Sequence, residues 1–262
     1  SIAQDPTFTQ FYANPLYLNP AFAGSARCPR ANLNYRNQWP ALSGTFVTYT
    51  ASYDQYLKSV DGGVGLMVLN DQAGEGTLST TRVSGFYAYQ FNLTRKFAIR
   101  AGAEVASFQR KLDWSKLTFG DQIDPRKGFI YETNDTPRGG GASAADFGAG
   151  LLGYSDKFYF GFAVTHLTQP DESLIIGESP LPRKYTAHIG AKIDLSKGYV
   201  KKTGTSISPN IMYQSQEDFK QLLYGLYVSR GPIVGGVWYR DKDAFILLAG
   251  VQTGQISFGY SY

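Results

Sequence analysis

The stretch KYTAHIGAKIDL, residues 184–195, alternates strictly between two kinds of side chain. Its odd positions are aromatic or aliphatic, and its even positions are polar, charged or glycine. A period of two is expected of a β-strand, whose successive side chains point to opposite faces. A soluble sheet would not bury Lys192 and Asp194 on one face while leaving Tyr and Ile in water on the other. A polar lumen with lipid outside reverses this constraint, so the stretch predicts a strand of a membrane barrel.

The same alternation recurs from residue 31 to the end of the chain, for example with Phe158, Phe160, Phe162 and Val164 on one face. The segments are longer than the five or six residues of an average soluble strand, and a tilted strand needs about 9–11 residues to cross a bilayer. We predict thirteen strands, at 31–38, 44–54, 62–70, 77–91, 96–112, 142–154, 157–167, 184–195, 203–214, 218–229, 232–240, 243–251 and 255–262.

The links between these predicted strands differ in length according to their position. The tightest follow the fourth, sixth, tenth and twelfth strands, and the two longest, 113–141 and 168–183, follow the fifth and seventh. Outer-membrane barrels have short periplasmic turns and longer external loops. The parity therefore predicts both long loops outside the cell and the N-terminal segment on the periplasmic side. The link at 241–242 departs from the rule, because it is short and on the external side.

Residues 1–30 differ from the rest because they are rich in proline and contain two Asn-Pro pairs. Proline disfavours both helix interiors and central strands, so we predict an irregular, extended or turn-rich segment that is periplasmic or lumenal. Residues 31–262 form the predicted all-β, antiparallel up-and-down transmembrane β-barrel. Single-chain bacterial barrels have an even number of strands. We therefore estimate about fourteen, with one strand missing from the chain or supplied by the N-terminal segment.

The composition agrees with this fold class. Aromatic residues make up 15% and charged residues only 18% of the chain, against about 25% charged in typical globular proteins. There is no run of about 18 apolar residues, which excludes a transmembrane helix. Cys28 is the only cysteine and cannot form an internal disulfide. The net charge of +4 is mild and its basic residues are scattered, so no nucleic-acid partner is expected.

The two histidines, His166 and His188, do not assemble into a catalytic set. His188 falls on the polar face of its predicted strand, where a hydrogen-bonding role in the lumen is the main expectation. His166 falls on the apolar face near a strand end and is interpreted as interfacial. No spacing typical of a metal site is present. We therefore predict no enzyme activity, no catalytic residue and no cofactor or metal.

Charges and aromatics within the predicted strands have two further interpretations. A selective pore competes with a plugged lumen whose charges pair with one another, and the second is favoured. The charges are Arg36, Arg100, Glu104, Lys192, Asp194 and Arg240. Trp and Tyr residues gather where barrels carry aromatic girdles at the headgroup level. The predicted girdle residues are Trp39, Tyr49, Tyr53, Tyr87, Tyr89, Trp238 and Tyr239.

Three strings in the first third of the chain resemble the PorP/SprF family of type IX secretion system outer-membrane proteins of Bacteroidetes. They are QDPTFTQFYANPLYLNPAFAG (4–24), LNYRNQWPAL (33–42) and GGVGL (62–66). The motif residues are Asn14, Pro15, Asn19, Pro20, Gly24, Tyr35, Arg36, Asn37, Gln38, Trp39 and Pro40.

The resemblance implies a barrel in the bacterial outer membrane, surrounded by outer-membrane lipid, that handles secreted cargo such as a gliding adhesin. It implies binding through the C-terminal domain of the cargo, for anchoring or export, together with other type IX secretion components including periplasmic ones. A passive or solute-specific outer-membrane channel is the alternative function.

Apolar side chains in the two long predicted loops suggest a partner surface, because exposed apolar patches often mark interaction sites. Folding of these loops back over the lumen is the competing interpretation, and the N-terminal segment could contact a periplasmic partner instead. The candidate partner-binding residues are Trp114, Phe119, Phe129, Tyr131, Leu174, Ile175 and Ile176.

Overall fold

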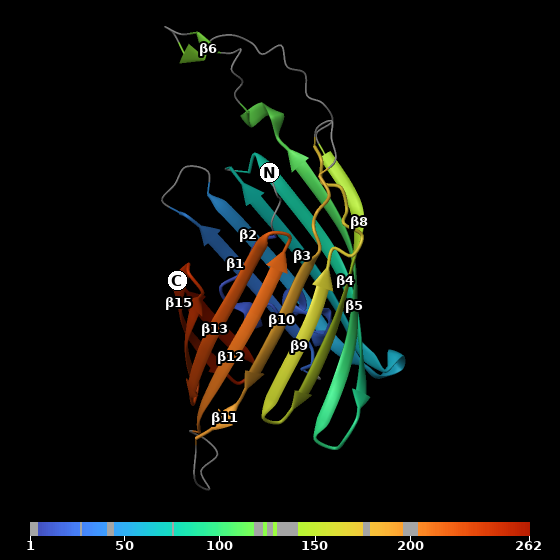
Figure 1. The fold of residues 1–262 in the computed structure, drawn as a ribbon, viewed down its shortest axis with the longest axis vertical. Coiled ribbons are helices and arrows are strands. Elements are labelled where there is room, and N and C mark those ends of the chain that lie inside the picture. The colour runs from blue at the N-terminus through green and yellow to red at the C-terminus, as the bar shows by residue number, and fades with distance from the viewer. Residues whose placement is uncertain are drawn as a thin grey trace.

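The computed structural model describes residues 5–26, 28–40, 45–74, 76–117, 123–124, 128–129, 141–174, 179–195 and 204–262. These residues form one 14-stranded antiparallel sheet whose strands pair in chain order (Figure 1). Its strands are β1 (Arg30–Gln38), β2 (Phe46–Leu57), β3 (Gly62–Ala73), β4 (Leu78–Asn92), β5 (Phe97–Leu112), β8 (Gly141–Ser155), β9 (Phe158–Thr165), β10 (Lys184–Ala191), β11 (Ile193–Asp194), β12 (Thr205–Gln216), β13 (Phe219–Arg230), β14 (Ile233–Arg240), β15 (Ala244–Thr253) and β16 (Ile256–Ser261).

The prediction of an antiparallel up-and-down sheet of about fourteen strands is confirmed. Each strand lies within a few residues of its predicted bounds, with one exception. The predicted strand 184–195 is interrupted at Lys192, whose backbone N–H donates to the carbonyl of Lys157 at 2.7 Å. Strand β10 therefore ends at Ala191, and the short strand β11 pairs with β12 separately. A second small sheet, β6 (Ile123–Asp124) with β7 (Gly128–Phe129), lies within the long link after β5 and was not predicted.

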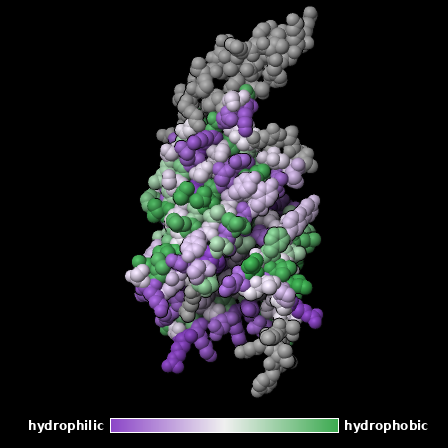
Figure 2. Space-filling view, turned by 180° about the vertical axis from the view of Figure 1, so that it is seen from behind, coloured by the Kyte–Doolittle hydropathy of each residue, from purple (hydrophilic) through white to green (hydrophobic). Residues whose placement is uncertain are grey.

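Side chains alternate between the two faces of the sheet, as the period of two requires. In β1 the exposed positions alternate with half-buried ones, and Leu33 and Tyr35 on the outer face are 84% and 62% exposed. Figure 2 shows hydrophobic side chains gathered over the middle of one outer face and hydrophilic side chains at its lower end. This distribution is that of a lipid-facing surface with polar margins.

No helix in the described part of the chain is long and apolar enough to cross a membrane.

The predicted aromatic girdle is correct for most of its members and wrong for one. Tyr49, Tyr53, Tyr87 and Tyr89 are each at least 36% exposed on the outside, and Trp39, just after the end of β1, is 56% exposed. Trp238, in contrast, is 0% exposed and points inward. Successive residues of a strand point to opposite faces, so Trp238 and Tyr239 could not both face lipid. The half-buried Tyr239 packs against Phe245 with tilted rings whose centroids lie 4.9 Å apart.

The two ends of the sheet differ in their connections. One end, here called the short-turn end, carries the links β4–β5, β8–β9, β13–β14 and β15–β16. The other, the long-loop end, carries the links β5–β8 and β9–β10, in agreement with the predicted parity. Strands β1 and β16 form the two edges of the sheet, and no ladder joins them among the described residues. The sheet curves around the N-terminal segment, which appears in dark blue within it (Figure 1).

Candidate functional site: a lumenal plug and the cavity beside it

Residues 5–26, here called the plug, form three short helical turns inside the curve of the sheet. These are η1 (Phe11–Ala13), α1 (Pro15–Leu18) and η2 (Pro20–Phe22). Pro15 and Pro20 each stand at the first position of a turn, where proline loses no backbone hydrogen bond. The Asn19 side chain accepts a bond from the Ala21 N–H at 2.9 Å and so caps η2. The two Asn-Pro pairs of the sequence therefore mark the beginnings of these turns.

Polar contacts of the plug reach strands on both halves of the sheet. Asn14 donates to the Thr50 hydroxyl of β2 at 3.1 Å. Asn19 donates to the carbonyl of Leu151 in β8 at 3.0 Å. The Thr9 and Ser261 hydroxyls, the latter in β16, lie 2.5 Å apart. A segment that contacts β2, β8 and β16 lies within the lumen, because these strands are far apart in the order of the sheet.

Glycines in the wall allow the plug backbone to approach β3 and β5 closely. A Cβ at Gly102 would overlap the backbone of Ala21, and one at Gly63 would overlap the carbonyl of Ala23. Gly63 belongs to the string GGVGL, and Ala21 and Ala23 belong to the string NPAFAG. Two of the family-like motifs therefore fit against each other in the lumen, which no alternation pattern in the sequence indicates.

Arg100, on the inner face of β5, holds the last turn of the plug. Its Nε donates to the carbonyl of Ala21 at 3.0 Å, and its Nη2 donates to the carbonyl of Ala23. Its Nη1 donates to Gln90 Oε1 at 3.0 Å. Arg100 is 1% exposed. This lumenal charge, one of the six singled out in the sequence, therefore interacts with the plug backbone and not with an open pore.

A second anchor lies at the point where the plug leaves the lumen to enter β1. Arg30 forms a two-point pair with Asp54, with its Nε 2.9 Å from one carboxylate oxygen and its Nη2 2.9 Å from the other. Asp54 also accepts a bond from the Gly24 N–H at 2.8 Å. Gly24 has φ +65, a left-handed conformation that glycine adopts without strain.

The opposite side of the plug packs into an aromatic and aliphatic cluster. Phe11 meets Trp238 edge to face, with ring centroids 5.1 Å apart. The buried members of this cluster are Phe11, Leu18, Met212, Leu223, Trp238 and Ile246. Burial of this much apolar surface is the main force that would keep the plug in place. It also explains why Trp238 faces inward.

His188 lies in the lumen, as predicted, but without the expected hydrogen bonds. Its ring stacks on Phe22 of the plug, with centroids 5.6 Å apart and an interplanar angle of 19°. Neither ring nitrogen has a hydrogen-bond partner among the described residues. The residue therefore contributes an aromatic surface to the plug.

The interpretation of His166 as interfacial is wrong. Its φ of +58 turns the chain at the end of β9, so the side chain departs from the alternation and points inward. It is 2% exposed. Strict alternation fails here because the backbone has already left the extended conformation.

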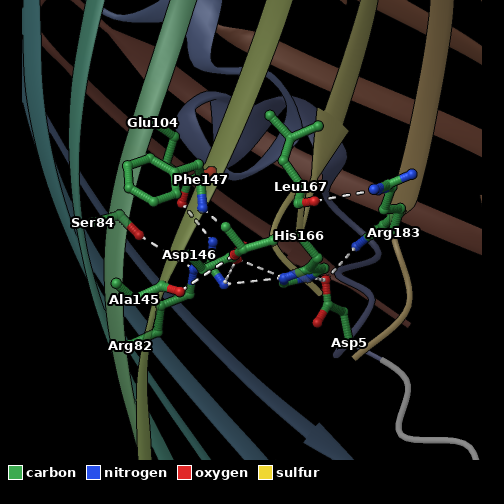
Figure 3. A network of polar contacts seen from close by, with 12 residues as sticks. Asp5, Arg82, Ser84, Glu104, Ala145, Asp146, Phe147, His166, Leu167 and Arg183 are labelled. Atoms are coloured by element: carbon green, nitrogen blue, oxygen red, sulfur yellow. Dashed lines mark hydrogen bonds and ion pairs between the residues drawn. The ribbon is translucent and has the colours of Figure 1, made fainter. Parts of the chain in front are cut away.

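His166 joins the plug to a network of charges at the long-loop end (Figure 3). Its Nε2 lies 2.9 Å from Asp5, and its Nδ1 lies 2.7 Å from Asp146 of β8. Arg82 of β4 bridges Asp146 at 2.8 Å and Glu104 at 3.0 Å. Burial alone would lower the pKa of His166, but Asp5 and the hydrogen bonds to both carboxylates raise that pKa to about 9. His166 therefore carries a proton at neutral pH.

Asp5 is the acidic partner contributed by the plug. Its carboxylate also lies 3.4 Å from Lys184 Nζ, and its N–H donates to Gln216 Oε1 at 3.2 Å. Burial alone would raise the pKa of Asp5, but His166 and Lys184 outweigh this effect and lower it. The ion pairs fix the first described residue of the plug near the long-loop end.

Beside the plug at this end lies a cavity of about 810 Å³. Six basic and five acidic side chains line it, together with several apolar ones. The charged residues are Arg36, Arg82, Arg110, His166, Lys184, Arg240, Asp5, Asp71, Glu104, Glu172 and Asp243. A volume of this size falls within the range of ligand-binding sites.

Part of the predicted external loop 168–183 folds inward over the lumen. Glu172 pairs with Arg110 of β5 at 2.5 Å, and Leu181 is 4% exposed at the cavity wall. Leu174, one of the candidate partner residues, is half-buried. The residues of this loop that the structure describes therefore fit the competing interpretation, in which the loop folds back over the lumen.

The other candidate partner residues have no described side-chain positions. Trp114 begins the turn η4 (Trp114–Lys116), and Phe129 ends β7. Phe119, Tyr131, Ile175 and Ile176 lie outside the described residues. Their role in partner binding remains a prediction.

The motif LNYRNQWPAL divides between the two faces of β1. Tyr35 is exposed on the outside, where it packs against Tyr49 with ring centroids 5.2 Å apart. Trp39 follows the end of β1 with φ +57, and it is exposed at the rim of the cavity, which it helps to line. Arg36 and Gln38 line the cavity. Asn37 and Pro40 are exposed. The motif therefore supplies side chains both to the outer face and to the cavity.

Several residues of the site were not identified from the sequence. Arg82 and Asp146 lie on the inner faces of β4 and β8, where their alternation could have indicated lumenal charges. Asp5 lies in an irregular segment and gave no such signal. Lys184 begins the stretch that indicated the fold, but its partner Asp5 is 179 residues away.

The sheet, its apolar outer face and its polar, plugged lumen define an outer-membrane β-barrel protein. A family model described as type IX secretion system membrane protein PorP/SprF matches residues 1–262, and the chain belongs to this family. Membership implies interaction with other components of that secretion system. A comparison with curated proteins gives no match.

Proposed function

We propose that this barrel binds a secreted cargo protein at its long-loop end, through the C-terminal domain of the cargo, and anchors it or assists its export. The family supplies the secretion system. The plug supports binding of the cargo by the barrel and not passage of the cargo through its lumen, because plug residues contact the wall from β2 to β16. A folded cargo domain has no route through a lumen filled in this way. A gliding adhesin is one cargo of the proposed kind.

The long-loop end is the proposed cargo surface and faces the outside of the cell in this proposal. It carries the cavity, the inward-folded Glu172 and the two long links that contain the candidate apolar residues. In this proposal the short-turn end faces the periplasm and contacts periplasmic components of the system. There the plug is fixed by Arg30 and Asp54, and the wall has tight turns such as 93–96.

Co-purification tests this proposal. The barrel is purified from its own outer membrane in mild detergent, and the bound proteins are identified by mass spectrometry. We expect a secreted protein with a C-terminal signal domain. Replacement of residues 118–140 by a short Gly-Ser linker should remove that protein from the eluate, whereas a sequence change in the turn 93–96 should leave it. Recovery of the barrel without cargo would count against the proposal, as would cargo binding that survives the loop replacement.

A passive or solute-specific channel is the competing function. The cavity at the long-loop end would be its entrance, but the plug lies between the cavity and the short-turn end. Planar-bilayer recordings of the intact barrel distinguish the two functions, because a channel must show openings and a plugged binding barrel must not.

A further inference from the structure

Two arginines from different strands, Arg36 of β1 and Arg240 of β14, both line the wall of the cavity. Arg36 occupies an inward position of β1, between the outward residues Tyr35 and Asn37. Arg240 is the last residue of β14. Both side chains line the cavity, and their positive charges repel each other. Like charges held close together in a partly buried wall are unfavourable unless an anion lies between them.

Neither guanidinium is fully used by the protein. Arg36 forms no hydrogen bond and no ion pair with the described residues. The carboxylate of Asp71, which lines the same cavity, accepts a bond from Thr48 at 2.6 Å. Arg240 pairs through Nη1 with Asp243 at 2.8 Å, but Asp243 is 56% exposed. The buried Nε of Arg240 has no partner in the described part of the chain. Exposed pairs of this kind contribute little, so donors on both arginines are available to a ligand.

Three of the other basic side chains of the cavity already have acidic partners. Arg82 pairs with Glu104, Arg110 with Glu172, and Lys184 with Asp5. Asp71 and Asp243 also line the cavity, but Asp71 forms no ion pair with the described residues and Asp243 reaches only Nη1 of Arg240. The remaining N–H donors of the two arginines are therefore available to a planar carboxylate. Guanidinium groups bind carboxylates through paired N–H donors in a fixed plane.

An unused acceptor lines the same cavity on the strand beside Arg240. Leu223 of β13 stands opposite Arg240, and Gln221 lies two residues further along on the same face. The buried Oε1 of Gln221 has no partner among the described residues, and Gln221 lines the cavity. An amide N–H on the ligand would satisfy this oxygen. Apolar rings are close by, since Trp39 and Phe46 line the same cavity with centroids 5.7 Å apart.

A carboxylate, a neighbouring amide N–H and an apolar side chain are together the chemistry of a peptide C-terminus. We propose that Arg36 and Arg240 bind the α-carboxylate of a peptide that enters from the long-loop end. Gln221 accepts the N–H of its last residue, and Trp39 and Phe46 contact its side chain. This site is a property of the cavity alone and stands whether or not the chain binds the cargo proposed above.

The test compares two peptides that differ only at the terminus. The full barrel, refolded in detergent, is titrated calorimetrically with N-acetyl-Gly-Gly-Phe as the free acid and as the C-terminal amide. We expect the acid to bind at least about tenfold more tightly than the amide, because a hydrogen-bonded charge is lost in the amide. The R36Q and R240Q variants should each lose this preference. Arg230→Gln, an exposed arginine at the short-turn end, is the matched control and should keep it.

Three results would overturn the proposal. Equal binding of acid and amide to the unchanged barrel would remove the carboxylate site without recourse to any variant. Inorganic phosphate that competes as well as the peptide would show a general anion site and not a site for a peptide terminus. A preference that survives in folded R36Q and R240Q would place the carboxylate elsewhere. Cargo co-purification is measured separately, so the failure of either proposal is recognisable.

Discussion

His166 Nε2 lies 2.9 Å from the carboxylate of Asp5, and this contact joins the end of β9 to the beginning of the plug. The two residues are 161 positions apart in the chain. Asp146 and Arg82 complete the network from β8 and β4. Because the plug fills the lumen, the strength of this contact bears on whether the barrel is open or closed at its long-loop end.

The first prediction concerns the pH dependence of this contact. The pKa of His166 is raised from 6.5 to about 9, so its contribution to stability is complete below pH 6.5 and is lost as the pH rises through about 9. We expect the urea midpoint of unfolding, followed by gel mobility, to fall over this interval. His166→Gln should start from a lower midpoint and show a flatter pH profile. Identical profiles for the two proteins would contradict the assignment.

A second prediction concerns the close approach of the plug to β5. In Gly102→Ala the new Cβ overlaps the backbone of Ala21, and overpacking of this kind costs about 1–3 kcal/mol. We expect faster proteolysis within residues 5–26 and a lower urea midpoint. Gly235→Ala is the control, because its Cβ would meet nothing within 4 Å. Equal effects of the two substitutions would show that the approach of Ala21 to Gly102 is unimportant.

Arg100 provides a third prediction. Arg100→Met keeps the length of the side chain but leaves the carbonyls of Ala21 and Ala23 without their donor. Buried hydrogen bonds to charged groups contribute about 1.5–3 kcal/mol each, so we expect a loss of about 3 kcal/mol in the free energy of unfolding. Denaturant titration measures this loss. Arg95→Met, at an exposed position in a turn of the short-turn end, should change stability by less than about 0.5 kcal/mol.

The fourth prediction separates the plugged barrel from a channel. Deletion of residues 1–24 removes the three helical turns of the plug and should convert a silent barrel into one with steady openings in planar bilayers. It should also shift the fluorescence of Trp238 to longer wavelength, because this residue loses Phe11 and gains water. The folded state is checked by gel mobility. Openings of equal size in the intact and deleted proteins would show that the plug does not obstruct the lumen.

Most of the barrel could be predicted because its physics is local. Each strand carries its own period of two, as at 184–195, and lipid on one side enforces that period. The loop lengths gave the two ends of the sheet, and aromatics such as Tyr49 and Tyr87 were placed outward correctly. Alternation failed where the backbone changed conformation, at His166 and at Lys192.

The sequence by itself determined the strands, their faces, the two ends of the barrel and, through its motifs, the family. Only the tertiary structure decided that residues 5–26 fill the lumen, that Trp238 points inward and that Asp5 pairs with His166. These contacts join irregular segments to strands far away in the chain, and no period along the sequence encodes them. Residues 184–195 illustrate both contributions, that of the sequence and that of the tertiary structure. Its alternation indicated the strand, but the partners of Lys184 and His188 come from the folded plug.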